Sequence, residues 1–196
     1  MSKVKVREAN VLVVYFTQTG NTEKVARAIY DEVLSSGYEA QLKDVKEITA
    51  IDLSKYDLVF LGSACHSANL ATPVLKILAD IPPESRLKVA GFATHSSPRP
   101  GGSERDQELY DRWASGCIKS FEKAAHETRL DLLGYFGCQG AASLPIEEFI
   151  HSTIIPNEEE WQTYVSSIRK HPDTTDIEEA KEFARNVLIE YRNKCL

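Results

Sequence analysis

Residues 17–22 of this chain read Thr-Gln-Thr-Gly-Asn-Thr and lie between an apolar run and a helical pattern. Three hydroxyl side chains flank Gly20, a residue that lets the backbone come close to a ligand. A helix N-terminus presents free N–H groups and the positive end of the helix dipole, so such a stretch is typical of an anion site. The sequence therefore predicts that hydroxyl and amide groups hold a phosphate here.

The same stretch lacks the features of the common nucleotide-binding loops. It contains no lysine and so does not match G-x-x-x-x-G-K-[ST], and it does not match G-x-G-x-x-G either. A phosphate held without a basic residue keeps much of its negative charge. The alternative interpretation is that Asn21 or Thr22 only caps the following helix, for which one such residue is enough.

Two further polar segments follow apolar runs along the chain. Residues 63–71 come after the run 58–61, and residues 94–102 come after the run 89–93. In an open parallel sheet such segments meet beyond the carboxyl ends of the strands, where ligands bind. We therefore expect both segments to join residues 17–22 around one site.

The elements that position these segments alternate along the chain. Strands are predicted at residues 11–16, 38–45, 58–61, 89–93 and 130–138, and helices at residues 22–36, 73–81, 106–128 and 177–192. Gly37 is expected to cap the first helix, and Thr175 with Glu178 predicts a capping box for the last. The alternation predicts one α/β domain over residues 1–196, a doubly wound five-stranded parallel sheet with helices on both faces. Residues 139–157 receive no assignment.

With its Thr-x-Thr-Gly-Asn-Thr stretch placed directly after the first strand, the sequence resembles the flavodoxin family. The resemblance covers the alternation of strands and helices over residues 10–138 and, more loosely, the rest of the chain. It implies a flavodoxin-like fold with the strand order 2-1-3-4-5, and FMN bound where the strand order reverses.

The resemblance also implies which residues contact FMN. The first segment would hold the phosphate, the second would line one side of the flavin ring near its N5 atom, and the third would bond the pyrimidine end through backbone amides. The implied cofactor-binding residues are Thr17, Gln18, Thr19, Gly20, Asn21, Thr22, Ser63, Ala64, Cys65, His66, Thr94, His95, Ser96, Ser97 and Gly102.

Two departures from the family pattern affect how the flavin would be used. Electron-carrier flavodoxins usually place the ring between a Trp and a Tyr, whereas these segments have no aromatic residue except His66 and His95. Trp113 is expected in the core, because it lies four residues from both Leu109 and Cys117. Many carriers have a Gly whose peptide flips beside N5, and this chain reads Ser-Ala-Cys-His there.

The favoured interpretation is an FMN-binding electron-transfer protein that serves redox partner proteins. The alternative is an FMN-dependent NAD(P)H:quinone oxidoreductase, or a reductase of similar acceptors, and a second alternative is a flavodoxin-like binding module without flavin. In the reductase, His66 or His95 would supply or take a proton, since imidazole titrates near neutral pH. The chain is expected to be a monomer or a homodimer.

Three other positions allow more than one interpretation. Cys65 is expected to be a buried small hydrophobic residue, with a redox thiol as the alternative. Arg99 is expected to be exposed without a partner, and the alternative is an ion pair with a substrate carboxylate or a nucleotide phosphate. The His-Pro-Asp sequence at residues 171–173 is expected only to precede the last helix.

The composition argues against several classes of partner. The 196 residues include 23 basic and 29 acidic side chains, a net charge of −6 that argues against nucleic-acid binding. The apolar run at residues 11–16 is far shorter than the roughly 20 residues that span a bilayer, so no membrane partner and a cytoplasmic location are expected. The four cysteines and five histidines lack metal-ligand spacing, which predicts free thiols and no metal site. Residues 141–196 carry 11 acidic and 6 basic residues, which form either ordinary solvated helix faces or an acidic docking surface.

Overall fold

Five parallel strands form the centre of the computed structural model, which describes residues 9–195. The elements in chain order are β1 (Asn10–Phe16), α1 (Asn21–Ser35), β2 (Glu39–Asp44), the 3₁₀ helix η1 (Val45–Glu47), α2 (Ala50–Leu53), β3 (Leu58–His66), β4 (Asn69–Leu70), α3 (Thr72–Ala79), β5 (Lys88–His95), α4 (Glu104–Trp113), α5 (Gly116–Thr128), β6 (Asp131–Gln139), α6 (Leu144–Phe149), the π-helix η2 (Ile150–Ile154), α7 (Glu158–Ile168) and α8 (Thr174–Lys194). The strand order is β2-β1-β3-β5-β6, and the short β4 pairs antiparallel with the end of β3. The predicted doubly wound sheet and its order 2-1-3-4-5 are confirmed.

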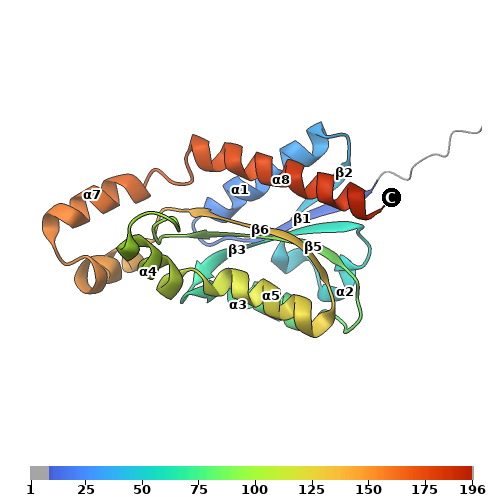
Figure 1. The fold of residues 1–196 in the computed structure, drawn as a ribbon, viewed down its shortest axis with the longest axis horizontal. Helices are drawn as coiled ribbons and strands as arrows, with labels where there is room; N and C mark the ends of the chain where they lie inside the picture. The colour runs from blue at the N-terminus through green and yellow to red at the C-terminus, as the bar shows by residue number, and fades with distance from the viewer. Residues whose placement is uncertain (1–8, 196) are drawn as a thin grey trace, which may run out of the picture.

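The central strand β1 shows why a continuous apolar run becomes a strand here. Val11 and Val13 pack with α1 and α8, while Leu12 and Val14 pack with α3 and α5. All four side chains are fully buried, because successive side chains of a strand point to opposite faces and both faces are covered. Figure 1 shows α1 and α8 on one face of the sheet and α3 and α5 on the other.

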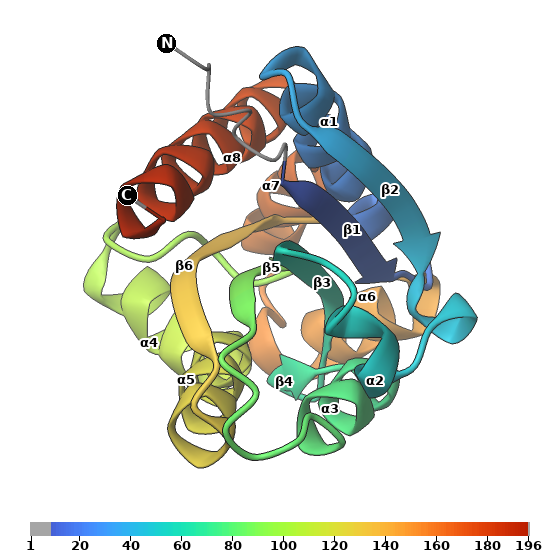
Figure 2. The same cartoon turned by 90° about the vertical axis from the view of Figure 1, so that its right-hand side faces the viewer.

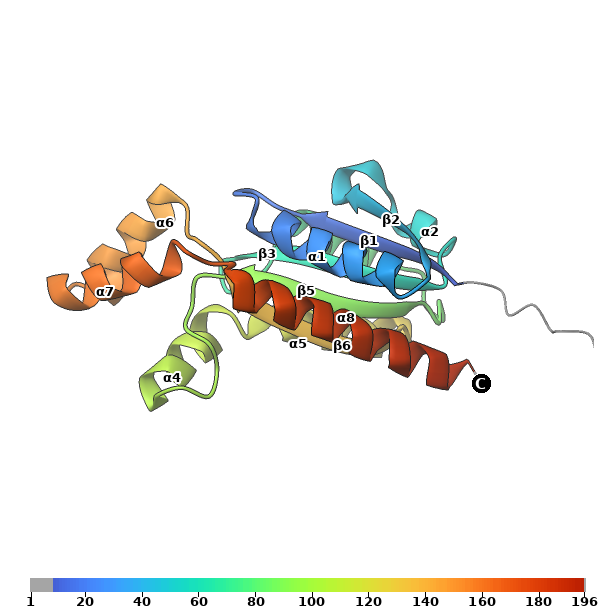
Figure 3. The ribbon, with the colours of Figure 1, turned by 90° about the horizontal axis from the view of Figure 1, so that it is seen from above.

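Between β6 and α8 the chain leaves the sheet and forms a lobe of α6, η2 and α7. The lobe lies beyond the end of the sheet, on the same side as α4 (Figures 1 and 3). It has a small core of its own, formed by Ile150, Ile155, Trp161 and Val165, and Trp161 stacks on His151 with ring centroids 4.6 Å apart. This lobe fills the range that sequence analysis left unassigned and adds α7, which it did not predict.

The single helix predicted over residues 106–128 is wrong, because the structure has two helices that are separated at Ala114 and Ser115. The second helix begins against the turn between β3 and β4, where a Cβ on Gly116 would lie 2.1 Å from the carbonyl oxygen of Ala68. The apolar spacing of four residues continues through the break, so the pattern did not reveal it. Figure 2 shows α4 and α5 as separate helices beside the sheet.

The prediction of a loop at residues 63–71 is wrong in part. The strand β3 continues to His66 and returns through Ser67 and Ala68 into β4. Both turn residues are left-handed, with φ of +50° and +65°. Two-residue hairpins usually place Asn or Gly at such positions, so the Ser-Ala pair gave no turn signal.

The last helix begins earlier than predicted and has a different cap. The Asp173 side chain accepts hydrogen bonds from the N–H groups of Thr175 and Asp176, and the Asp176 carboxylate accepts one from the Asp173 N–H. The capping box is therefore Asp173 with Asp176, and the predicted pairing of Thr175 with Glu178 is wrong. Gly37 follows α1 at φ +86°, as predicted.

No helix within residues 9–195 is both long and apolar enough to cross a membrane.

Candidate functional site

A cavity of about 560 Å³ lies at the carboxyl ends of β1, β3 and β5, where the three predicted segments meet. This volume is within the range of roughly 300–1,000 Å³ that is typical of small-molecule sites. The segments contribute Gln18, Thr19, Asn21, Ala64, Cys65, His66, Ser67, Ala68, Thr94, His95, Ser96, Ser97 and Pro98 to its wall. Among the described residues that line the cavity there is no Lys, Arg, Asp or Glu.

The polar end of the cavity is the stretch 17–22 at the start of α1. Gly20 occupies the N-cap position at φ +86°, and no side chain within the described residues caps this helix. The first hydrogen bond of the helix runs from the Lys24 N–H to the Gly20 carbonyl, so the N–H groups of residues 21–23 have no helical acceptor. The alternative that Asn21 or Thr22 serves only as a cap is therefore wrong.

Two threonine hydroxyls of the polar end keep a hydrogen to donate. Thr17 Oγ1 accepts a bond from the Gly20 N–H at 3.0 Å, and Thr19 Oγ1 accepts one from Asn21 Nδ2 at 2.9 Å. Because both oxygens act as acceptors, each O–H remains available to a ligand. Asn21 Nδ2 also lies 2.7 Å from the Ala141 carbonyl oxygen, which fixes the stretch against the chain that leaves β6.

Five of the predicted site residues do not belong to the cavity wall, namely Thr17, Gly20, Thr22, Ser63 and Gly102. Thr22 and Ser63 are fully buried. Thr22 Oγ1 lies 2.9 Å from Thr94 Oγ1, and Ser63 Oγ accepts a bond from the Ala71 N–H at 2.8 Å. The Thr22 hydroxyl therefore joins the first and third segments, and the Ser63 hydroxyl bonds within the second. Gly102 is exposed just before α4, outside the cavity wall.

The apolar end of the cavity comes from α4 and from the lobe. Its members are large hydrophobic side chains, namely Leu109, Trp113, Ile146, Phe149, Ile150, Ile154, Ile155 and Tyr164. Trp113 meets Phe149 edge to face, with ring centroids 5.8 Å apart. The expected core position of Trp113 is wrong, because α4 ends at this residue and leaves its half-buried ring in the cavity wall.

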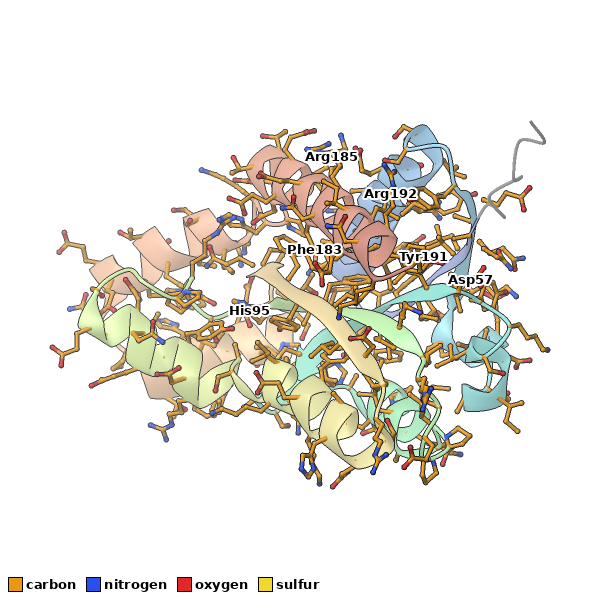
Figure 4. All side chains as sticks on the ribbon, turned by 45° about the vertical axis from the view of Figure 1, so that its right-hand side comes forward. Asp57, His95, Phe183, Arg185, Tyr191 and Arg192 are labelled. Carbon is orange, nitrogen blue, oxygen red and sulfur yellow. The ribbon has the colours of Figure 1, made fainter. Side chains whose placement is uncertain are left out.

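His95 is held inside the cavity wall as a neutral side chain. Its Nδ1 lies 3.2 Å from the Ser97 carbonyl oxygen, which can only accept, so Nδ1 donates and Nε2 carries the lone pair. Burial lowers the pKa of His95 to about 4, and Nε2 has no hydrogen-bond partner among the described residues. A neutral imidazole is poorly suited to the predicted role of proton donor near neutral pH. Figure 4 shows His95 at the end of the sheet that faces α4 and the lobe.

The other predicted histidine, His66, is half-buried in the cavity wall and meets the ring of Phe16 edge to face at 5.8 Å between centroids. Cys65 is also half-buried in the wall, so its expected position as a buried hydrophobic residue is wrong. All four cysteines are free thiols, as predicted.

Arg99 fixes the third segment to the start of α8. It pairs with the fully buried carboxylate of Asp176 and lies 2.8 Å from Glu179, so the expectation of an unpaired Arg99 is wrong. His171 bonds the same Asp176 carboxylate and thus does more than precede the helix. Donor atoms of His171, Asp173 and Asp176 lie within 4.8 Å of one another, but Asp176 already serves Arg99, His171 and the Asp173 N–H.

Comparison with known proteins agrees with this arrangement. The family model described as flavodoxin domain matches residues 12–185. The flavodoxin-like domain-containing protein BilS of Clostridioides difficile (strain CD3) is 31% identical over 185 residues, which cover 91% of this chain and 96% of that protein.

Solved structures show the same fold at low sequence identity. Oxidised flavodoxin 2 from Bacillus cereus has a TM-score of 0.61 and 19% identity, over 93% of this chain and 99% of that one. Rubredoxin oxygen:oxidoreductase from Desulfovibrio gigas has a TM-score of 0.62 and 16% identity, over 95% of this chain and 37% of that one.

Proposed function

This chain belongs to the flavodoxin domain family, whose model spans residues 12–185, and from that membership we propose that it binds FMN in the cavity and transfers electrons between redox partner proteins. The observation that carries the proposal is the uncapped N-terminus of α1, which opens on a cavity with no charged residue in its described wall. A phosphate monoester joined to an uncharged ring system has the chemistry that these two features require.

The residues present fit FMN at both ends of the cavity. At the polar end, the N–H groups of residues 21–23 and the hydroxyls of Thr17 and Thr19 would hold the phosphate. At the apolar end, Trp113 and Phe149 would cover the ring and exclude water. Bound FMN would supply the redox chemistry, since the flavin accepts electrons that no side chain here can hold.

Two observations favour an electron carrier over an NAD(P)H:quinone oxidoreductase. The described wall offers no Lys or Arg to a second nucleotide phosphate, and Arg99 is engaged by Asp176 and Glu179. A carrier also needs its cofactor close to the surface. Ile146 and Phe149 line the cavity and are 45% and 41% exposed, so they provide an apolar mouth that a partner protein can cover.

The acidic residues of the last third of the chain contribute less to docking than their number suggests. Glu147 pairs with Arg169, Glu178 with Lys181, and Glu160 with a basic residue of α4. We therefore place the docking face at the cavity mouth on α6, and we expect the unneutralised acidic residues to act at longer range by steering a basic partner.

Binding of FMN and of riboflavin, measured side by side, tests the proposal. Riboflavin has the same ring system without the phosphate, so the difference reports the polar end alone. Hydrogen bonds to a charged group contribute about 1.5–3 kcal/mol, which predicts an FMN preference of about 10-fold to 150-fold. Equal affinity for the two, or no binding of either, would overturn the FMN site. Sustained oxidation of NADH or NADPH by a quinone in the presence of the FMN-loaded protein would instead support the reductase.

A further inference from the structure

Two cysteines from distant parts of the chain meet in the wall of the cavity. Cys65, at the end of β3, is half-buried and lines the cavity, whereas Cys117, in the first turn of α5, is fully buried behind it. Cys117 belongs to the hydrophobic cluster on the α3 and α5 face of the sheet, and Cys65 packs against that cluster. The two thiols are close enough to shift each other's pKa. One thiol of the pair is thus open to a small molecule and the other is shielded.

The backbone holds the two cysteines together. Cys65 pairs across the β3–β4 hairpin with Leu70, and the start of α5 packs against the turn of that hairpin, where Gly116 leaves no room for a Cβ. One turn further along α5, Ser120 Oγ donates to Asn69 Oδ1 at 2.6 Å. The residues on both sides of Cys117 therefore contact the hairpin that carries Cys65.

The two thiols differ in acidity in the way that a reactive pair requires. Contact with Cys117 lowers the pKa of Cys65, and contact with Cys65 together with burial raises the pKa of Cys117. Cys65 Sγ also lies 3.3 Å from the Trp113 carbonyl oxygen, at the junction of α4 and α5. Cys65 has the exposure of an attacking thiol and the lower pKa of the two, and Cys117 has the buried position of a resolving thiol.

The remaining cysteines have no such arrangement. Cys138 is fully buried in the cluster on the opposite face of the sheet, with α1 and α8. Burial raises the pKa of the Cys138 thiol. Cys195 is exposed directly after α8. Cys138 therefore serves as an internal control for reactions of Cys65 and Cys117, and the exposed Cys195 is the thiol to remove before they are measured.

We propose that Cys65 and Cys117 form a redox-active dithiol that reduces small disulfides entering through the cavity. The Cys65 thiolate attacks one sulfur of the disulfide, forms a mixed disulfide and releases the first thiolate. Cys117 then gives its proton to the thiolate released first, attacks the Cys65 sulfur and releases the second thiolate. In sum, two electrons pass from the dithiol to the disulfide, and the Cys65–Cys117 bond forms as the bond in the substrate breaks. This reaction needs no flavin, and because Cys65 lines the cavity in which we place FMN, it belongs to the protein without bound FMN.

Thiol titration in glutathione buffers tests the proposal on the full chain purified without added flavin. The Cys195→Ser background removes the exposed thiol. After equilibration from reducing to oxidising ratios and acid quench, alkylation and peptide mass mapping identify each cysteine. We expect Cys65 and Cys117 to lose their thiols together and to appear as one linked peptide, while Cys138 stays alkylated throughout. Retention of both thiols at the most oxidising ratio would overturn the proposal.

Single substitutions in the same background separate the two roles. With Cys117→Ala, a small apolar residue suited to a buried site, the glutathione adduct on Cys65 should accumulate because no thiol resolves it. With Cys65→Ala neither adduct nor linked peptide should form, and with Cys138→Ala the linked peptide should form as before. Accumulation of the glutathione adduct in the unsubstituted pair would contradict the assignment of Cys117 as the resolving thiol.

Discussion

The polar end and the apolar end of the cavity are built in different ways. The polar end is one stretch of six neighbouring residues, 17–22, in which Thr17 bonds the Gly20 backbone and Thr19 bonds Asn21, while Asn21 also reaches the Ala141 carbonyl. The apolar end draws on α4, α6, η2 and α7, which are held over the sheet by contacts between distant residues. Two of those contacts are the Arg99 ion pairs with α8 and the hydrogen bond from Tyr164 to the Ser96 carbonyl at 2.7 Å.

Because of this difference, substitutions at the two ends should separate effects on ligand binding from effects on the free energy of unfolding. A change at a hydroxyl of the polar end that faces the ligand, such as that of Thr19, removes a donor from the ligand and leaves the packing intact. A change in the contacts that hold the apolar end affects the free energy of unfolding as well, because each contact joins parts of the chain that are far apart in sequence. Four measurements, given from the largest expected effect to the smallest, test this separation.

Arg99→Gln should lower the free energy of unfolding by about 3 kcal/mol, since it leaves the fully buried Asp176 carboxylate without its cation. Urea denaturation measures the change. The matched control is Arg105→Gln, which breaks an exposed pair with Glu160 and should cost at most about 1 kcal/mol. Equal losses for the two variants would show that Arg99 does not fix the apolar end.

Acid should destabilise the protein through His95. Its pKa is about 4 in the folded chain and 6.5 ordinarily, so between these values the unfolded chain binds a proton that the folded chain does not. The contribution of His95 to stability is therefore present above pH 6.5 and is lost as pH falls towards 4, by about 3 kcal/mol. The plot of unfolding free energy against pH should be flatter over this window for His95→Gln than for the wild type. Parallel curves would contradict the prediction.

Trp113→Ala should weaken FMN binding by about 1–2 kcal/mol, or 5-fold to 30-fold, through loss of ring contact at the apolar end. Because the half-buried Trp113 ring also contacts Phe149 of α6, the urea midpoint should fall as well. Ile189→Ala, at a 55% exposed position of α8, is the control and should leave FMN affinity unchanged. A Trp113 variant that binds FMN normally would remove this residue from the proposed site.

Thr19→Ala should weaken FMN binding by about 1.5 kcal/mol, leave riboflavin binding unchanged and leave stability unchanged. Thr22→Ala should do the reverse, since its hydroxyl bonds Thr94 inside the protein, and should lower the unfolding free energy by about 1 kcal/mol. Both variants are measured by flavin titration and urea denaturation. Identical behaviour of the two threonines would erase the distinction between a ligand-facing and a structural hydroxyl.

Sequence patterns predicted the sheet and the polar end because each is determined by residues that are neighbours in the sequence. The strand at residues 11–16 and the Thr-Gln-Thr-Gly-Asn-Thr stretch each contain their own signal. The partners of Arg99 are 77 and 80 residues away, and no local pattern indicates them. The break before Gly116 could not be predicted for a related reason. It lies where the start of α5 packs against the carbonyl of Ala68, which belongs to another element.

One missed element did carry a signal. Trp161, Val165 and Ile168 lie at helical spacing in α7, and the Asn157 side chain caps its first turn through the Glu160 N–H. The prolines at 145 and 156 suggest that no regular element forms before this helix, although Pro145 only occupies the first turn of α6. The apolar wall of the cavity could therefore be predicted only in part. The sequence predicts the helix α7 but does not predict its position over the sheet.

The two tryptophans give each half of this arrangement its own optical reporter. Trp113 is in the cavity wall against Phe149, and Trp161 is in the core of the lobe, stacked on His151 at 9° between the ring planes. Emission from the first reports occupancy of the cavity, and emission from the second reports the integrity of the lobe. With the other tryptophan replaced, each residue gives its own fluorescence signal, one for ligand entry and one for loosening of the segment that surrounds the ligand.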